Sequence, residues 1–208
     1  MQAHDTTDDS ILMERVAKGD KNALCELIDR WEKPLCSFTY RYVQNREVVK
    51  DLVAETFIRL YGARDRYDPS KKFSSWLFKI AANLCKNHCR WKLRHREDAP
   101  LEDYSDVRIG SEIQTCDNNP SDKLVAEEDF MLLKLAIDSM PHTLKTALIL
   151  YYYQDLTYKE ISEAIGCSER GVETKLYRAR AYLSKYFESK SNTRLERYVK
   201  GEGIPASA

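Results

Sequence analysis

Helix-breaking residues are scarce in this sequence, and long apolar runs are absent from it. Seven glycines and six prolines occur among 208 residues, too few for the frequent tight turns of a sheet-rich fold. No apolar stretch approaches the roughly 20 residues that cross a bilayer. The acidic start MQAHDTTDDS does not resemble a signal peptide. We therefore expect a cytoplasmic protein with no membrane insertion.

The cysteines do not form the pattern of a disulfide framework. All six are scattered through a chain of medium size, which favours reduced, buried side chains. Cys85, His88 and Cys89 have the spacing i, i+3, i+4, which would place three possible metal ligands on one helix. Zinc would need a fourth ligand, so small side chains packed in a core are favoured over a metal or redox site. We expect no metal and no cofactor.

Apolar residues recur at spacings of three and four through most of the chain, which predicts an all-α fold. Pro34 is expected to kink or interrupt the second helix. Ser121 can cap a helix, and Pro141 suits the first turn of the next. The expected helices lie near 9–18, 21–43, 46–63, 74–93, 122–139 and 141–154, followed by two more within 156–183.

Charge is balanced overall but unevenly distributed. The chain has 33 basic and 33 acidic residues. Residues 64–96 carry ten Lys or Arg against two acids, residues 97–129 carry eleven acids against two basic residues, and residues 170–200 carry nine basic residues against three acids. Because nucleic acids bind to local positive charge, two basic segments joined by an acidic one fit a nucleic-acid partner.

The acidic stretch predicts a boundary between domains. It has no sustained apolar period and contains Pro100, Gly110 and Pro120, which is typical of a flexible linker. We therefore expect two small helical domains joined by a flexible acidic linker. The expected parts are a domain at 1–95, the linker at 96–121, a second domain at 122–187 and a mobile tail at 188–208.

Residues 156–183, LTYKEISEAIGCSERGVETKLYRARAYL, predict two helices joined by a tight turn. Thr157 and Glu160 fit a capping box at the start of the first helix. Gly166 can end that helix in the left-handed conformation, and Ser168 can cap the next one. This layout is a helix-turn-helix.

The second of these helices has one apolar side and one polar side. Its apolar stripe is formed by Val172, Leu176, Ala179 and Leu183. In helix-turn-helix proteins the start of the second helix enters the major groove, so Arg170 and Thr174 are best placed for bases and Lys175 and Arg178 for phosphates. A helical hairpin with a solvated charged face is the alternative on this pattern alone. The expected DNA-binding residues are Ser168, Arg170, Thr174, Lys175, Tyr177 and Arg178.

Two separate stretches resemble one known family. Residues 139–183, from SMPHTLKTALIL to KLYRARAYL, resemble region 4 of bacterial RNA polymerase sigma factors of the extracytoplasmic-function (ECF) group, within the sigma-70 family. DLVAETFIRLY (51–61) and FSSWLFKIAANLCKNHCR (73–90) resemble sigma region 2. The two stretches occur in the family's order with a linker between them. The resemblance covers roughly residues 10–187.

The resemblance implies an alternative sigma factor without catalytic activity. Such a protein binds core RNA polymerase through its beta-prime and beta subunits and directs promoter recognition, DNA melting and transcription initiation. The 156–183 stretch would then contact the −35 element. Arg170-Gly171 and Glu173 differ from what many relatives carry, so the preferred −35 sequence stays open. The resemblance also implies an anti-sigma factor as a partner, and a linker that runs along the RNA-exit path of the polymerase; a simple tether is the alternative.

One side of the expected helix 46–63 carries Asp51, Glu55 and Ile58, away from its apolar residues. Taken alone, this side is most simply a solvated surface. Because DLVAETFIRL matches the sigma segment that docks on the coiled coil of the beta-prime subunit, the resemblance implies that these three residues bind core polymerase.

The expected helix 74–93 carries a cationic, amide-bearing side that suits DNA. The resemblance implies that this helix and the loop before it recognise the −10 element and capture a flipped base. Trp76 fits DNA contact and core packing equally well. The expected −10 residues are Lys71, Lys72, Phe73, Ser74, Trp76, Lys79, Asn83, Lys86, Asn87 and Arg90.

Two other classes of function compete with a sigma factor. An autonomous helix-turn-helix regulator would leave the 51–61 match unexplained and would normally carry a dimerisation or ligand domain, which the sequence does not indicate. An enzyme would need a phosphate-binding glycine loop, a nucleophile motif or a complete metal set, and none is recognisable.

Overall fold

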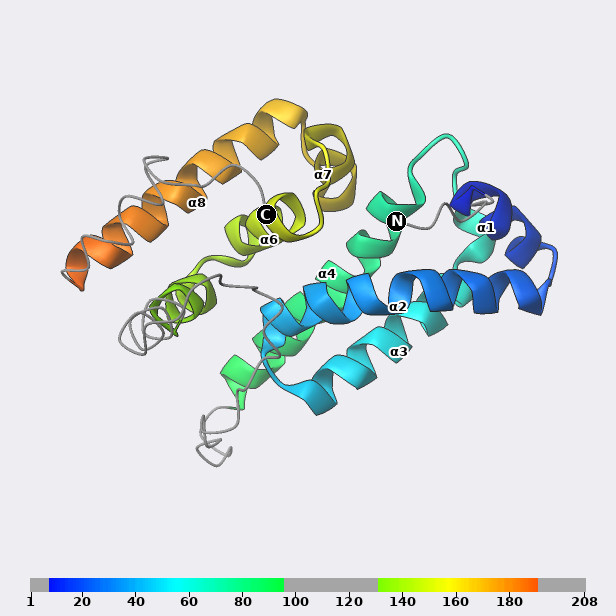
Figure 1. The fold of residues 1–208 in the computed structure, drawn as a ribbon, viewed down its shortest axis with the longest axis horizontal. Helices are drawn as coiled ribbons and strands as arrows, with labels where there is room; N and C mark the ends of the chain where they lie inside the picture. The colour runs from blue at the N-terminus through cyan, green and yellow to red at the C-terminus, as the bar shows by residue number, and fades with distance from the viewer. Residues whose placement is uncertain (1–7, 96–130, 191–208) are drawn as a thin grey trace, which may run out of the picture. The chain divides into compact units, whose positions relative to one another are not determined.

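The computed structural model describes residues 8–95 and 131–190, and these residues form helices and connecting loops without a strand. The expected all-α fold is confirmed for this part of the chain. The linker 96–121, Ser121 and most of the tail lie outside the described residues. The helices are α1 (Asp9–Ala17), α2 (Lys21–Val43), α3 (Arg46–Gly62), the 3-10 helix η1 (Arg64–Arg66), α4 (Phe73–Arg94), α6 (His142–Tyr153), α7 (Tyr158–Ile165) and α8 (Glu169–Ser189), coloured along the chain in Figure 1. Residues 131–139 are helical as well.

The chain divides into two compact units. Among the described residues, the first unit comprises 8–89 and 141–179, and the second comprises 90–95, 131–140 and 180–190. In the second unit, the Tyr182 hydroxyl donates to the main-chain oxygen of Ser139 at 2.9 Å. No helix in the described part of the chain is long and apolar enough to cross a membrane.

Local capping signals decide where the first three helices begin. The carboxylates of Asp8 and Asp20 and the amide oxygen of Asn45 each accept a main-chain N–H from the following turn, at 3.1, 2.9 and 3.1 Å. Each of these bonds satisfies a donor that the helix itself leaves unpaired. The expected helix starts near residues 9, 21 and 46 therefore agree with the structure.

Helix α2 has the expected bounds and is not interrupted at its proline. It continues through Pro34 from Lys21 to Val43, so the expected interruption is wrong. A proline inside a helix removes one main-chain hydrogen bond. The buried residues on both sides of it, Leu27, Leu35 and Phe38, hold this helix in the core and offset that loss.

Aromatic side chains join α2 to α4. Phe78 of α4 packs against Phe38 at 5.2 Å between ring centroids and against Trp31 at 6.0 Å. Edge-on and tilted ring pairs at this separation add to the free energy gained by burying apolar area. Helices α2 and α3 run side by side in Figure 1. The positions of the α3 and α4 surfaces thus depend on α2.

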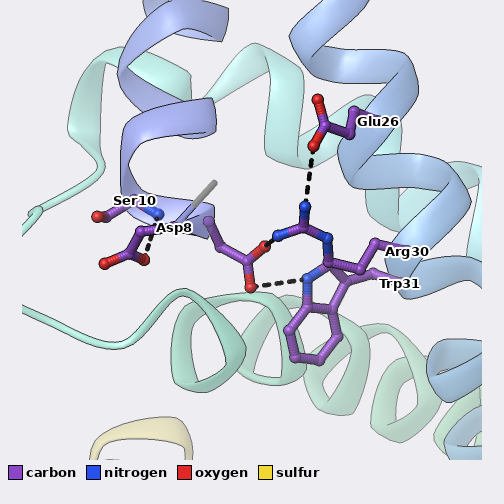
Figure 2. A network of polar contacts seen from close by, with 6 residues as sticks. Asp8, Ser10, Glu26, Arg30 and Trp31 are labelled. Atoms are coloured by element: carbon purple, nitrogen blue, oxygen red, sulfur yellow. Dashed lines mark hydrogen bonds and ion pairs between the residues drawn. The ribbon is translucent and has the colours of Figure 1, made fainter. Parts of the chain in front are cut away.

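Helix α1 is tied to α2 by one carboxylate (Figure 2). Asp9 accepts a hydrogen bond from the Trp31 indole nitrogen at 3.1 Å and forms an ion pair with Arg30. Arg30 also donates to Glu26 at 2.9 Å. Because the indole donates along its ring plane, this bond fixes the orientation of the Trp31 ring.

Candidate nucleic-acid interface

The expected helix-turn-helix is present in α7 and α8. The Glu160 amide donates to the Thr157 hydroxyl at 3.3 Å, and the Thr157 amide donates to the Glu160 carboxylate at 2.9 Å, so both halves of the capping box form. Gly166 ends α7 with φ 71°, in the left-handed region. Ser168 then accepts from the Gly171 amide at 3.1 Å and caps α8.

The first turn of α8 packs closely at a second glycine, Gly171. A Cβ on Gly171 would lie 3.3 Å from the Cys167 side chain and 3.3 Å from the Ser168 hydroxyl. Gly171 therefore allows the first turn of α8 to approach the preceding residues closely. The Ser168 hydroxyl is occupied by its cap, so this residue shapes the start of α8 in addition to any contact with DNA.

The two sides of α8 differ in burial as the sequence predicts. Val172, Leu176 and Ala179 are buried, and the first two belong to the hydrophobic core. The residues expected to contact DNA lie on the other side. Ser168, Arg170, Thr174, Tyr177 and Arg178 are exposed, Tyr177 to 72%, and Lys175 is half-buried.

The hydroxyl of Thr174 is partly committed within α8. It donates to the main-chain oxygen of Arg170 at 2.9 Å, which leaves it able to accept a hydrogen bond from a base or a bound water. Glu173 is exposed beside it. A carboxylate among cations reduces non-specific attraction to phosphate and can accept from the amino group of cytosine.

The expected −10 residues of α4 form an exposed polar side. Lys79, Asn83, Asn87 and Arg90 are exposed and Lys86 is half-buried. Other positions of the same helix are buried in the core, among them Leu77, Ala81 and Leu84. This side of α4 is therefore available to phosphates and base edges.

The first residue of α4, Phe73, packs in an aromatic cluster. Phe73 is only 3% exposed and packs against Trp31, Tyr67 and Trp76, with ring centroids 5.7, 6.1 and 6.4 Å apart. The buried Phe73 ring packs under the loop that precedes α4 and is not accessible to a ligand. Trp76 and Ser74 are half-buried, whereas Lys71 and Lys72 are exposed. Phe73 therefore has a structural role, whereas the exposed Lys71 and Lys72 are free to contact DNA.

The Cys85 thiol of α4 is a core group. Cys85 is fully buried, and burial, with the neighbouring Cys89 as a second cause, raises the pKa of its thiol to about 12. A thiol that stays protonated is a poor metal ligand. In residues 8–95 and 131–190, no group of three His, Cys, Asp or Glu side chains is arranged to hold a metal ion.

The side of α3 with Asp51, Glu55 and Ile58 faces away from its core. Ile58 is 65% exposed, whereas Val53 and Phe57 on the same helix are buried. Glu55 pairs with Arg59 at 2.7 Å. Tyr61, which is not among the residues expected from the sequence, is also exposed. Its spacing of i+3 from Ile58 is the signal that places both on one side of the helix.

Comparison with known proteins gives the class of protein to which these helices belong. Residues 27–95 match the family description "Sigma-70 region 2", and residues 130–183 match "Sigma-70, region 4". The first match contains α3 and α4, and the second contains α6, α7 and most of α8. These two matches define the class as a transcription initiation factor of the sigma-70 type.

Individual relatives narrow that class. The ECF RNA polymerase sigma-E factor of Haemophilus influenzae is 31% identical over 177 residues, which cover 84% of this chain and 93% of the relative. The chain belongs to the ECF group of RNA polymerase sigma factors. It is an alternative sigma factor, which acts with core RNA polymerase in promoter recognition and transcription initiation.

Two solved structures share the fold. CnrH, solved in complex with the cytosolic domain of CnrY, has a TM-score of 0.63 and 21% identity and covers 87% of this chain and 97% of its own. The sigma factor RpoE of Bartonella quintana, solved with the anti-sigma factor NepR, has a TM-score of 0.54 and 20% identity and covers 78% of this chain and 95% of its own. At these identities the likeness concerns the fold.

Proposed function

We propose that this sigma factor docks on core polymerase through α3 and reads promoter DNA with α4 and α8. In this proposal Asp51, Glu55 and Ile58 contact the beta-prime subunit. The exposed side of α4, together with Lys71 and Lys72, contacts the −10 element, and the start of α8 contacts the −35 element. The proposed domains are 1–95 and 122–187, joined by the linker 96–121. The protein works in the cytoplasm, by recognition and not by catalysis.

The exposure of Ile58 is the observation that carries the docking assignment. An isoleucine that is 65% exposed gains little from folding, since most of its apolar area stays in water. Two carboxylates lie on the same helix before it, Asp51 by two turns and Glu55 by one. An aliphatic anchor with charged neighbours is typical of a protein interface with an apolar centre and a polar rim.

The test is promoter-directed run-off transcription with bacterial core polymerase and genomic promoter fragments. We expect Ile58→Ser to weaken core binding roughly 10- to 150-fold, because burying an isoleucine side chain stabilises a complex by about 1.5–3 kcal/mol. Specific transcripts should fall in proportion at limiting sigma concentration. The double substitution Asp51→Arg/Glu55→Arg should abolish them by reversing the charge of the same face.

A matched control is available on α1. Ile11 is also exposed, to 50%, but lies outside the proposed docking face, so Ile11→Ser should leave transcription at the wild-type level. Equal losses in Ile11→Ser and Ile58→Ser would reject docking through α3. Absence of specific transcripts with wild-type protein, together with retained binding to duplex DNA, would instead favour an autonomous regulator.

An anti-sigma factor is the second proposed partner. The related fold of RpoE from Bartonella quintana was solved with the anti-sigma factor NepR, and we extend this class of partner to the present chain. Co-expression with proteins encoded next to it should yield one that co-purifies with it and blocks run-off transcription. If no neighbouring product blocks transcription, this part of the proposal is wrong.

A further inference from the structure

The loop between η1 and α4 is braced by its own residues. Asp68 accepts from the Ser70 amide at 3.0 Å and from the Ser70 hydroxyl at 2.7 Å, and the Lys71 amide donates to the Asp68 main-chain oxygen at 3.0 Å. These bonds form a tight turn of the kind that aspartate favours. The Lys71 ammonium also lies 3.8 Å from the Asp68 carboxylate.

One further hydrogen bond connects this turn to Tyr67, the residue that precedes it. The Tyr67 hydroxyl donates to the main-chain oxygen of Lys71 at 3.1 Å. This bond joins Tyr67, just before the turn, to Lys71 at its end. It therefore restrains the main chain at the position from which the exposed Lys71 and Lys72 side chains project.

The ring of Tyr67 is itself held in place. It packs against Trp76 at 5.2 Å and against the buried Phe73 at 6.1 Å. Phe73 in turn packs on Trp31, whose indole is bonded to Asp9. The position of the Tyr67 hydroxyl thus follows from a contiguous series of fixed rings, and the loop is restrained by the core of α1, α2 and α4.

The Tyr67 hydroxyl stays protonated near neutral pH and so remains a hydrogen-bond donor. Burial, followed by the charges of Asp8 and Asp9, raises the pKa of Tyr67 to about 12. A phenylalanine at this position would keep the ring contacts but would lose the only Tyr67 donor.

We propose that Tyr67 is a positioning residue, which holds the loop 68–72 in the shape that receives an unstacked base of the −10 element before DNA arrives. A loop that is already ordered binds with less loss of conformational entropy. The cost of ordering would otherwise be subtracted from the energy available to separate the strands. This inference rests on the proposed function of the loop.

The test uses complete holoenzyme and two promoter probes. The first probe is a fork-junction DNA with an unpaired −10 strand, and the second is a fully paired duplex with the −35 element. We expect Tyr67→Phe to weaken binding to the fork roughly 2- to 10-fold, the range that follows from the loss of one hydrogen bond. Binding to core polymerase and to the −35 duplex should remain at wild-type values. Amide hydrogen exchange in residues 67–73 should become faster.

Tyr182→Phe is the matched control, because it also removes a tyrosine hydroxyl that donates to a main-chain oxygen, that of Ser139 at 2.9 Å. It should leave fork binding unchanged. Unchanged fork binding in Tyr67→Phe would overturn the inference, even with faster exchange. Equal losses on fork and duplex probes would overturn it as well, because they would indicate a general defect. If wild-type holoenzyme does not bind the fork specifically, the proposed function fails and the inference fails with it.

Discussion

Several residues of the candidate interface act through packing or capping. Phe73 supports the loop before α4 with a buried ring, and Ser168 uses its hydroxyl to cap α8. Substitutions at these two positions would change the shape of an interface without removing a direct contact. Binding losses at Phe73 and Ser168 should therefore be compared with the free energy of unfolding of the same variants before a contact is assigned.

Asp9 is expected to stabilise the protein more than other surface carboxylates do. Its carboxylate bonds to both Arg30 and Trp31, and its side chain is only 20% exposed. Asp9→Ala should lower the free energy of unfolding by about 1.5–3 kcal/mol, the range for lost hydrogen bonds to a charged group. The midpoint of urea unfolding measures this change.

Glu26 supplies the control for Asp9. It binds the same Arg30 at 2.9 Å but is 45% exposed, and exposed ion pairs contribute only about 0–1 kcal/mol. A urea midpoint that falls as far in Glu26→Ala as in Asp9→Ala would contradict the role given to the Asp9–Trp31 bond.

At the scale of helices, α8 combines a core-forming side with a mixed-charge side. Its exposed start carries Arg170 but also Glu169 and Glu173. Because nearby carboxylates oppose general attraction to phosphate, binding by this helix should depend more on base contacts than a purely cationic helix would.

Arg170→Ala is therefore expected to weaken binding to the −35 duplex roughly 5- to 150-fold, which corresponds to the loss of about 1–3 kcal/mol for a good bidentate base contact. Fluorescence anisotropy at one fixed salt concentration measures the affinity. Arg180→Ala is the control, since Arg180 is exposed on the same helix but lies outside the expected set. Equal effects of the two substitutions would indicate charge alone and would remove the base-reading role of Arg170.

At the scale of the whole molecule, basic and acidic residues balance at 33 each. General charge repulsion is therefore small near neutral pH, and individual groups set the response to acid. His142 is such a group. Burial, with the charge of Lys145 as a second cause, lowers the pKa of its imidazole below 6.5, and its Nδ1 is buried with no hydrogen-bond partner in the described part of the chain.

The sign of the effect follows from proton binding. The unfolded chain binds a proton at His142 more readily than the folded protein does, so the contribution of this group to stability is complete above pH 6.5 and is lost as the pH falls below that value. His142→Gln should reduce the dependence of Tm on pH between about 5 and 6.5. An identical Tm profile in both proteins would show that His142 does not control the acid response.

The positions of the helices and their exposed sides follow from local sequence signals. The capping residues Asp20, Asn45 and Thr157 and the left-handed Gly166 act within a few residues of themselves, so the sequence alone determines these boundaries. The same holds for the apolar stripe of α8. Pro34 is the exception, because packing on both sides of it overrides a local tendency.

Only the tertiary structure decided which side chains support the interface. Trp31 meets Asp9 from 22 positions away and packs on Phe73 from another helix. Contacts between residues so far apart in sequence depend on how the helices pack, and helical periodicity shows which side of a helix is buried but not which side chain it meets. For that reason the sequence indicated that Phe73 and Trp76 lie at the loop expected to contact DNA, while the packed structure showed that Phe73 is buried under this loop and that Tyr67 bonds to its main chain.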